Sequence, residues 1–220
     1  MTVLMVIGTI LMCFAVDWLV RIRKAPVTEL LKSGHAREHT TRVRLPQGLF
    51  FAPSHTWMSL LPSGKVWLGV DDFVGRLLDS PRVKLLVKAG DSVRRGDPIL
   101  SLAENGHSLT VRSPLDGDVV ACNGDLVHSP ELLREKTFSE GWALALQPAH
   151  ASELKRMLLG DETRTWIQDE FARLRDVFAG AGGALSPAML QDGGPPMAGA
   201  MKEMDEAVWK RFESEFLSVE

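Results

Sequence analysis

The chain has 220 residues, of which 45% are hydrophobic and 24% are charged, a balance that allows one medium-sized folded domain with appendages and excludes wholesale disorder. Its formal net charge of -3 argues against a nucleic-acid-binding protein, which would present a basic face. The two cysteines, Cys13 and Cys122, lie far apart and form no metal-binding motif, so neither a disulfide framework nor a structural zinc site is expected.

The first segment has the pattern of a membrane anchor. Residues 1–16 carry no charged side chain, and the apolar run resumes after Asp17. Three basic residues follow at once: Arg21, Arg23 and Lys24. Positive charge that occurs only after the apolar run predicts one transmembrane helix over residues 1–21. The three basic residues are expected at the membrane surface. The rest of the chain is expected on the cytoplasmic side of a bacterial inner membrane. A cleaved signal or a buried core helix is the alternative, and Asp17 fits the anchor only near the interface.

Residues 22–48 form a basic segment between this anchor and the next part of the chain. We interpret it as a juxtamembrane linker. Basic residues close to a membrane are attracted to anionic headgroups by about 1 kcal/mol each. A solvated linker without lipid contacts explains the same composition equally well.

From Leu49 to Gln147 short apolar runs alternate with turn signals, at the spacing of about 8–12 residues that is typical of a small mainly β domain. A helix is predicted over Asp71–Leu78, with Asp71 or Asp72 as its acidic start. The predicted strands are Lys65–Val70, Lys84–Val87, Ile99–Leu102, Leu109–Val111, Asp118–Ala121 and Trp142–Leu146.

Several motifs of this region occur in a characteristic order. They are an opening strand at Ser54-His55-Thr56-Trp57, the strand Gly64–Val70, the turns Ala89–Asp97 and Ser113–Val119, and an insert with Ser129–Leu133 and Glu140-Gly141-Trp142. In this order they resemble the H protein of the glycine cleavage system. The resemblance implies a lipoyl-type barrel-sandwich hybrid with flanking helices over residues 49–167.

That family carries lipoate on a lysine at the tip of a hairpin. Aligning back from the Ser-Pro turn at 113–114 places the lysine position on Gly106, within Asn105-Gly106-His107, and no lysine occurs from residue 89 to residue 135. We therefore expect no lipoylation at the usual position and no bound cofactor. Asn-Gly is a strong hairpin signal, so the hairpin itself is expected to persist. His107 is either a titratable replacement for the arm or, more commonly for a loop histidine, a solvated or hydrogen-bonded side chain.

After Pro148 the pattern becomes helical. A helix is predicted over Ser152–Leu159, and a second begins at Asp161 and continues through residues 168–180, beyond the resemblance. Residues 181–199 read as a flexible linker, and residues 200–219 as an amphipathic C-terminal helix. Its apolar stripe includes Met204, Val208, Phe212 and Phe216. We predict that these side chains dock on a partner, with packing on the chain's own barrel or second helix as the alternative.

No nucleophile with its base, phosphate-binding loop or dinucleotide motif is recognisable, so neither enzymatic activity nor a metal site is expected. The sequence favours a non-lipoylated, membrane-anchored H-like domain. It would act as a structural subunit or docking adaptor of a membrane complex, such as a redox complex, or bind a soluble enzyme that recognises H-like domains. The alternative function is a lipoyl or acyl carrier related to the glycine cleavage system with an unconventional attachment.

Overall fold

The computed structural model describes residues 45–180 and 198–219, all within the compact unit formed by residues 43–220. The predicted anchor (1–21) with Arg21, Arg23 and Lys24, most of the basic segment and most of the linker lie outside the described residues. Across the part that is described, no helix combines the length and the apolar character needed to cross a membrane.

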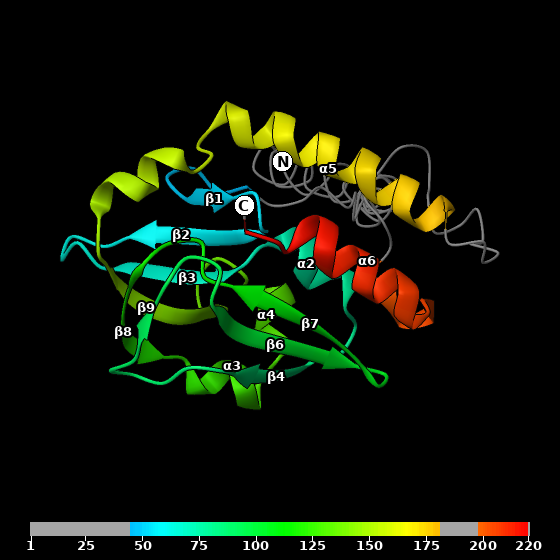
Figure 1. Ribbon diagram of the computed structural model, residues 1–220, viewed down its shortest axis with the longest axis horizontal. Helices are drawn as coiled ribbons and strands as arrows, with labels where there is room; N and C mark the ends of the chain where they lie inside the picture. The colour runs from blue at the N-terminus through cyan, green and yellow to red at the C-terminus, as the bar shows by residue number, and fades with distance from the viewer. Residues whose placement is uncertain (1–44, 181–197, 220) are drawn as a thin grey trace, which may run out of the picture. The chain divides into compact units, whose positions relative to one another are not determined.

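Two antiparallel sheets form the domain, which confirms the mainly β class (Figure 1). The larger sheet has the order β1-β2-β3-β9-β8-β5, and the smaller has the order β4-β6-β7. The strands are β1 Phe50–Ala52, β2 Thr56–Leu60, β3 Val66–Val70, β4 Arg82–Leu85, β5 Ser92–Val93, β6 Pro98–Glu104, β7 His107–Arg112, β8 Gly117–Cys122 and β9 Trp142–Pro148. The sequence pattern misses β1 and β5, because each is only two or three residues long, and it places β4 two residues too late.

Strands with one buried face have alternating apolar residues, and strands buried on both faces have continuous apolar runs. Along β7, Leu109 and Val111 are buried while Ser108 is exposed, which is the period-two pattern of a half-buried strand. Strand β9 lies in the interior of the larger sheet, and its residues 143–146 are all buried. A second apolar cluster around Trp57 packs against the core strands, so the larger sheet is partly covered on both faces.

The two Gly-Asp turns adopt the conformations that their residue types favour. Gly96 has a φ of 89°, a left-handed conformation that costs glycine little. The carboxylate of Asp97 accepts a hydrogen bond from the backbone N–H of Arg94 at 2.7 Å, and that of Asp91 accepts one from Lys88 at 2.9 Å. These local bonds fix the turns between the short strands.

The predicted helix after β3 is confirmed as α2, Asp72–Leu77. Asp71 caps it, since its carboxylate accepts hydrogen bonds from the backbone N–H groups of Phe73 and Val74, both at 3.1 Å. The other helices are α3 Gly124–His128, α4 Leu132–Glu135, the 3₁₀ helix η1 Ala151–Arg156, α5 Asp161–Ala179, the 3₁₀ helix η3 Ala200–Glu203 and α6 Glu206–Phe216.

The predicted α-helix over Ser152–Leu159 is wrong. The chain forms the short 3₁₀ helix η1 and then extends, because Leu158 pairs with Phe51 of β1 through two backbone hydrogen bonds of 2.8 and 2.9 Å. An extended residue at this position is incompatible with a helix that continues to Leu159.

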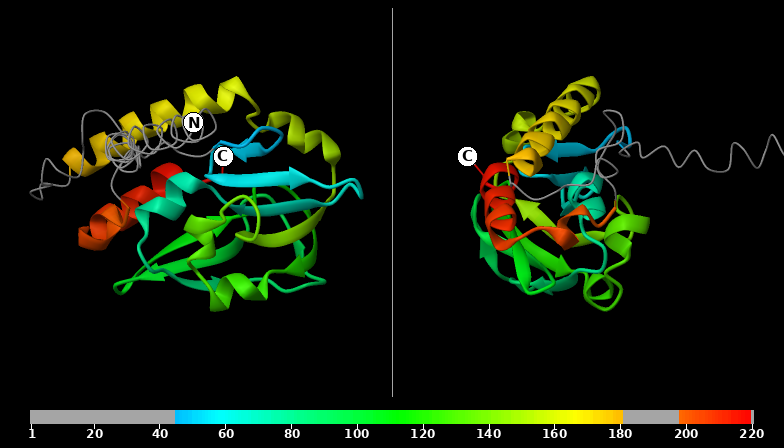
Figure 2. Two further views of the ribbon diagram at one scale, coloured as in Figure 1. Left: turned by 180° about the vertical axis from the view of Figure 1, so that it is seen from behind. Right: turned by 90° about the vertical axis from the view of Figure 1, so that its right-hand side faces the viewer.

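The amphipathic C-terminal helix α6 lies along β7 and beside α5 (Figures 1 and 2). Its side chains Val208, Phe212 and Phe216 are buried, and Met204 is partly buried against the same core. Of the two alternatives for this helix, the structure shows packing within the chain. The expectation that this stripe docks on a partner is therefore corrected, because its apolar surface is already covered.

This packing predicts that α6 contributes to the stability of the domain. The Phe212→Ala variant removes a fully buried ring and should lower the free energy of unfolding by about 3–5 kcal/mol. Lys210→Ala, on the exposed side of the same helix, should change it by less than about 0.5 kcal/mol. Urea unfolding of the full-length chain in a mild detergent measures both. Equal, small effects of the two variants would contradict the packing of α6 on the barrel.

Candidate functional site

The hairpin between β6 and β7 keeps its shape without a lysine. Asn105 and Gly106 form its two-residue turn with φ values of 51° and 84°, and Glu104 pairs with His107 at its base. Two successive positive φ values are those of the tight hairpin turn predicted from Asn-Gly. The Glu104 carboxylate also accepts hydrogen bonds from the backbone N–H groups of residues 79–80, at 3.2 and 2.7 Å, and so attaches the hairpin to the end of α2.

The C-terminal segment holds the other side of the hairpin tip. The Asn105 amide donates a hydrogen bond to the Lys202 carbonyl at 3.2 Å. The ring of His107 stacks on Trp209 of α6 with 5.4 Å between centroids, and the Trp209 indole N–H donates to the Met201 carbonyl at 3.1 Å. His107 is thus partly buried beneath α6, whereas Asn105 and Gly106 at the turn stay exposed.

A second group of polar side chains surrounds His55, which is completely buried. Its Nδ1 lies 2.8 Å from Asp71 Oδ2 and its Nε2 lies 3.6 Å from Glu170 Oε2. Its ring stacks on Phe73 at 4.2 Å and lies 4.8 Å from Trp166. The left-handed φ of 56° at His55 also explains why the opening strand begins at Thr56, two residues after the start of the predicted motif.

The two carboxylates determine the charge of this histidine. Burial lowers the pKa of His55, but attraction to and hydrogen bonding with Asp71, reinforced by Glu170, outweigh burial and raise the pKa above its ordinary value. Burial raises the pKa of Glu170, but hydrogen bonds and attraction from His55 and Arg173 outweigh it and lower the pKa. Both shifts favour the ion-paired state, with a protonated His55 beside a charged Glu170.

Arg173 connects this ion pair to α6. Its guanidinium donates to both carboxylate oxygens of Glu170, at 2.7 and 2.9 Å, and to the backbone carbonyl of Glu215 at 2.9 Å. The same guanidinium lies 4.9 Å from the ring centre of Phe216. The Glu170–Arg173 pair lies within α5, where Nη1 alone donates to both carboxylate oxygens, and the Nη2 bond to Glu215 links α5 to the end of α6.

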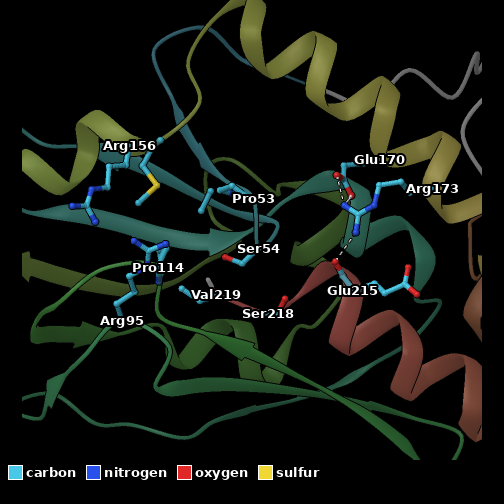
Figure 3. A pocket seen from close by; sticks show the side chains of 12 residues that line it. Pro53, Ser54, Arg95, Pro114, Arg156, Glu170, Arg173, Glu215, Ser218 and Val219 are labelled. Carbon is cyan, nitrogen blue, oxygen red and sulfur yellow. Dashed lines mark hydrogen bonds and ion pairs between the residues drawn. The ribbon is translucent and has the colours of Figure 1, made fainter.

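A pocket of about 380 Å³ opens beside this group (Figure 3). Its lining comes from the β1–β2 turn, two turns of the barrel, η1, α5 and the end of α6: Ala52, Pro53, Ser54, Arg95, Pro114, Arg156, Met157, Glu170, Arg173, Glu215, Ser218 and Val219. The Ser54 hydroxyl is buried there and has no hydrogen-bond partner among the residues that the structure describes. His55, His107 and Cys122 are not part of this lining, so the pocket does not gather them into a reactive centre.

The sequence analysis does not single out Glu170, Arg173 or the Ser54 hydroxyl. A signal exists for Glu170, because it falls on the apolar face of α5 between Trp166 and Leu174, where a carboxylate requires a buried partner. Within residues 45–180 and 198–219, no group of three or more histidine, cysteine, aspartate or glutamate side chains could hold a metal ion.

Two sheets closed over one core, joined by Gly-Asp turns and carrying a β6–β7 hairpin, define a lipoyl-type domain. Residues 49–170, more than half of the chain, match the family described as glycine cleavage H-protein, and the chain belongs to this family.

Curated relatives show the same similarity. A glycine cleavage system H protein from Oceanobacillus iheyensis is 29% identical over 125 residues, which cover 57% of this chain and 98% of the relative. One from Hydrogenovibrio crunogenus is 32% identical over 114 residues, or 52% of this chain and 88% of the relative. The crystal structure of such a protein from Mycobacterium marinum superposes with a TM-score of 0.44 at 21% identity, over 51% of this chain and 97% of that one.

The ion pair at His55 predicts a pH-dependent stability. Because the folded pKa of His55 is above 6.5, its contribution is complete below about pH 6.5 and is lost as the pH rises through the folded value. Because the folded pKa of Glu170 is below 4.5, its contribution is present above that pH and is lost on further acidification. The Glu170→Gln variant should therefore lose more unfolding free energy, relative to wild type, at pH 6 than at pH 9.

Urea unfolding at several pH values measures this difference. Glu162→Gln, on the exposed face of α5, is the matched control and should show no such pH dependence. A loss for Glu170→Gln that is the same at pH 6 and pH 9 would show that the two side chains are not coupled.

Proposed function

We propose that this H-protein family member is not lipoylated and serves as a docking adaptor or structural subunit of a membrane complex. The observation that carries this proposal is the β6–β7 hairpin tip. Its turn is Asn105-Gly106, which contains no lysine. Asn105 donates a hydrogen bond to the Lys202 carbonyl, and His107 next to the turn stacks on Trp209. A carrier needs an amine on this exposed turn, and Gly106, at the position expected for the lysine, offers none.

The lysines that flank the hairpin in the sequence do not replace the missing amine. Lys88 lies at the turn before β5, where its backbone N–H donates to Asp91. Lys136 follows α4 and forms an ion pair with Glu140 at 2.6 Å. Neither belongs to β6, β7 or their turn, so both lack the local geometry of an attachment hairpin.

An adaptor needs a surface for its partner, and exposed apolar side chains supply one. Leu86, Val120 and Val127 are 39–40% exposed. They belong to neighbouring elements, because α3 packs on β4 and the Cys122 thiol at the end of β8 lies 3.5 Å from the carbonyl of Val87. Exposed apolar groups on adjacent elements support a protein contact at this side of the barrel.

The membrane part of the proposal rests on the sequence of the first 48 residues. The uncharged run followed by Arg21, Arg23 and Lys24 supports a single-pass anchor with the H-like domain on the cytoplasmic side. A tether raises the local concentration of the domain near other membrane proteins, which suits an adaptor.

The absence of a lipoyl arm is testable by intact-mass spectrometry. The full-length chain incubated with a lipoyl ligase, ATP and lipoic acid should keep its unmodified mass, because Gly106 offers no amine. Gly106→Lys is the matched gain-of-function variant, since a side chain there meets no atom within 4 Å. It should gain the mass of one lipoyl group. Wild-type chain that gains this mass, in the reaction or in native membranes, would restore the carrier function.

The adaptor function is testable by affinity purification from native membranes in a mild detergent. A stoichiometric partner should co-purify with the unmodified chain. Val127→Asp places a charge among the exposed apolar side chains and should reduce partner recovery about tenfold or more. Leu159→Asp changes an equally exposed leucine on another part of the chain and should leave recovery unchanged. A chain that purifies alone, or from the soluble fraction, would contradict the proposal.

A further inference from the structure

The pocket beside Ser54 has an uneven distribution of charge. Arg95 and Arg156 lie on one side of Ser54, and the two carboxylates of the lining, Glu170 and Glu215, lie on the other (Figure 3). Charges separated in this way create a locally positive side even though the chain as a whole is acidic.

The carboxylates are already neutralised by cations of their own. Glu170 accepts two hydrogen bonds from Arg173, and the Glu215 carboxylate accepts one from Arg211 Nε at 2.7 Å. By contrast, Arg156 has no charged or hydrogen-bonded partner anywhere in the described part of the chain. The pocket therefore keeps an excess of positive charge on the side of Arg156.

Ser54 provides a second and independent sign of a ligand. It is 3% exposed, and its hydroxyl has no hydrogen-bond partner within the described residues although it lies in the pocket wall. Buried hydroxyl groups are nearly always hydrogen-bonded, because leaving them unpaired is unfavourable. A ligand atom in the pocket would supply the missing partner.

We propose that this pocket binds a small organic anion through a carboxylate or phosphate group. The guanidinium group of Arg156 holds the anion, and Ser54 Oγ donates a hydrogen bond to one of its oxygens. Guanidinium geometry matches both kinds of oxyanion. The volume of about 380 Å³ suits a small molecule or a lipid headgroup. The site does not depend on whether the hairpin carries a lipoyl group.

Titration of the full-length chain with inorganic phosphate, at constant ionic strength with chloride as the balancing ion, tests the site by calorimetry. Ser54→Ala and Arg156→Gln should each weaken phosphate binding roughly tenfold, the effect of losing one hydrogen bond to a charged group. Arg94→Gln makes the same charge change at an exposed arginine outside the lining and should bind as wild type does.

The thermal midpoint of Ser54→Ala without phosphate separates a ligand contact from a structural role. The hydroxyl has no internal partner to lose, so this midpoint should stay the same or rise. A lowered midpoint together with unchanged phosphate binding would assign Ser54 to structure alone and overturn the proposal.

Nanodiscs distinguish the two sources of the anion. Hydrogen exchange of the 52–54 turn is compared between phosphatidylglycerol and phosphatidylcholine nanodiscs, with and without inorganic phosphate. Protection in phosphatidylglycerol alone identifies a lipid headgroup, and protection only with added phosphate identifies a soluble anion. No protection in any of these conditions, or phosphate binding that Ser54→Ala and Arg156→Gln both retain, would overturn the site.

Discussion

His55 is buried between carboxylates that belong to different helices, and the arrangement of the helical layer on the barrel depends on this contact. Asp71 fixes the start of α2 and holds one side of the imidazole, while Glu170 of α5 holds the other. Arg173 then connects Glu170 to the end of α6. A buried charge that lost one of its partners would be strongly destabilising, so the three helices are positioned together.

The β6–β7 hairpin has the backbone shape of a carrier hairpin but has no lysine at its turn. In the two-residue turn, Asn105 and Gly106 satisfy the backbone requirement of a tight hairpin, and that requirement does not depend on a lysine. The C-terminal segment then uses the tip as a packing surface through His107 and Trp209. The packing involves one side of the hairpin, and Asn105 and Gly106 at the turn stay exposed.

Local sequence predicts much of the barrel and little of the site. The cap at Asp71 and the Asn-Gly turn follow from short-range preferences, so the sequence pattern identifies α2 and the β6–β7 hairpin correctly. The end of η1 depends on pairing between Leu158 and Phe51, which no local pattern contains. The same is true of α6, whose amphipathic stripe is visible in the sequence although the surface that it covers is not. The role of Glu170 as a partner of His55 follows from the packing of α5 on the barrel, which local sequence does not specify.

The contact between the hairpin tip and the C-terminal segment has a consequence for synthesis. Asn105 bonds to a residue 97 positions later in the chain. At the 5–20 residues per second of translation, this corresponds to a delay of roughly 5–20 s between the two partners. During that interval the nascent barrel exposes the apolar surface that α6 finally covers, including Phe73 beneath Phe216. The domain therefore passes through a stage with an open apolar face, which closes only after α6 has been synthesised.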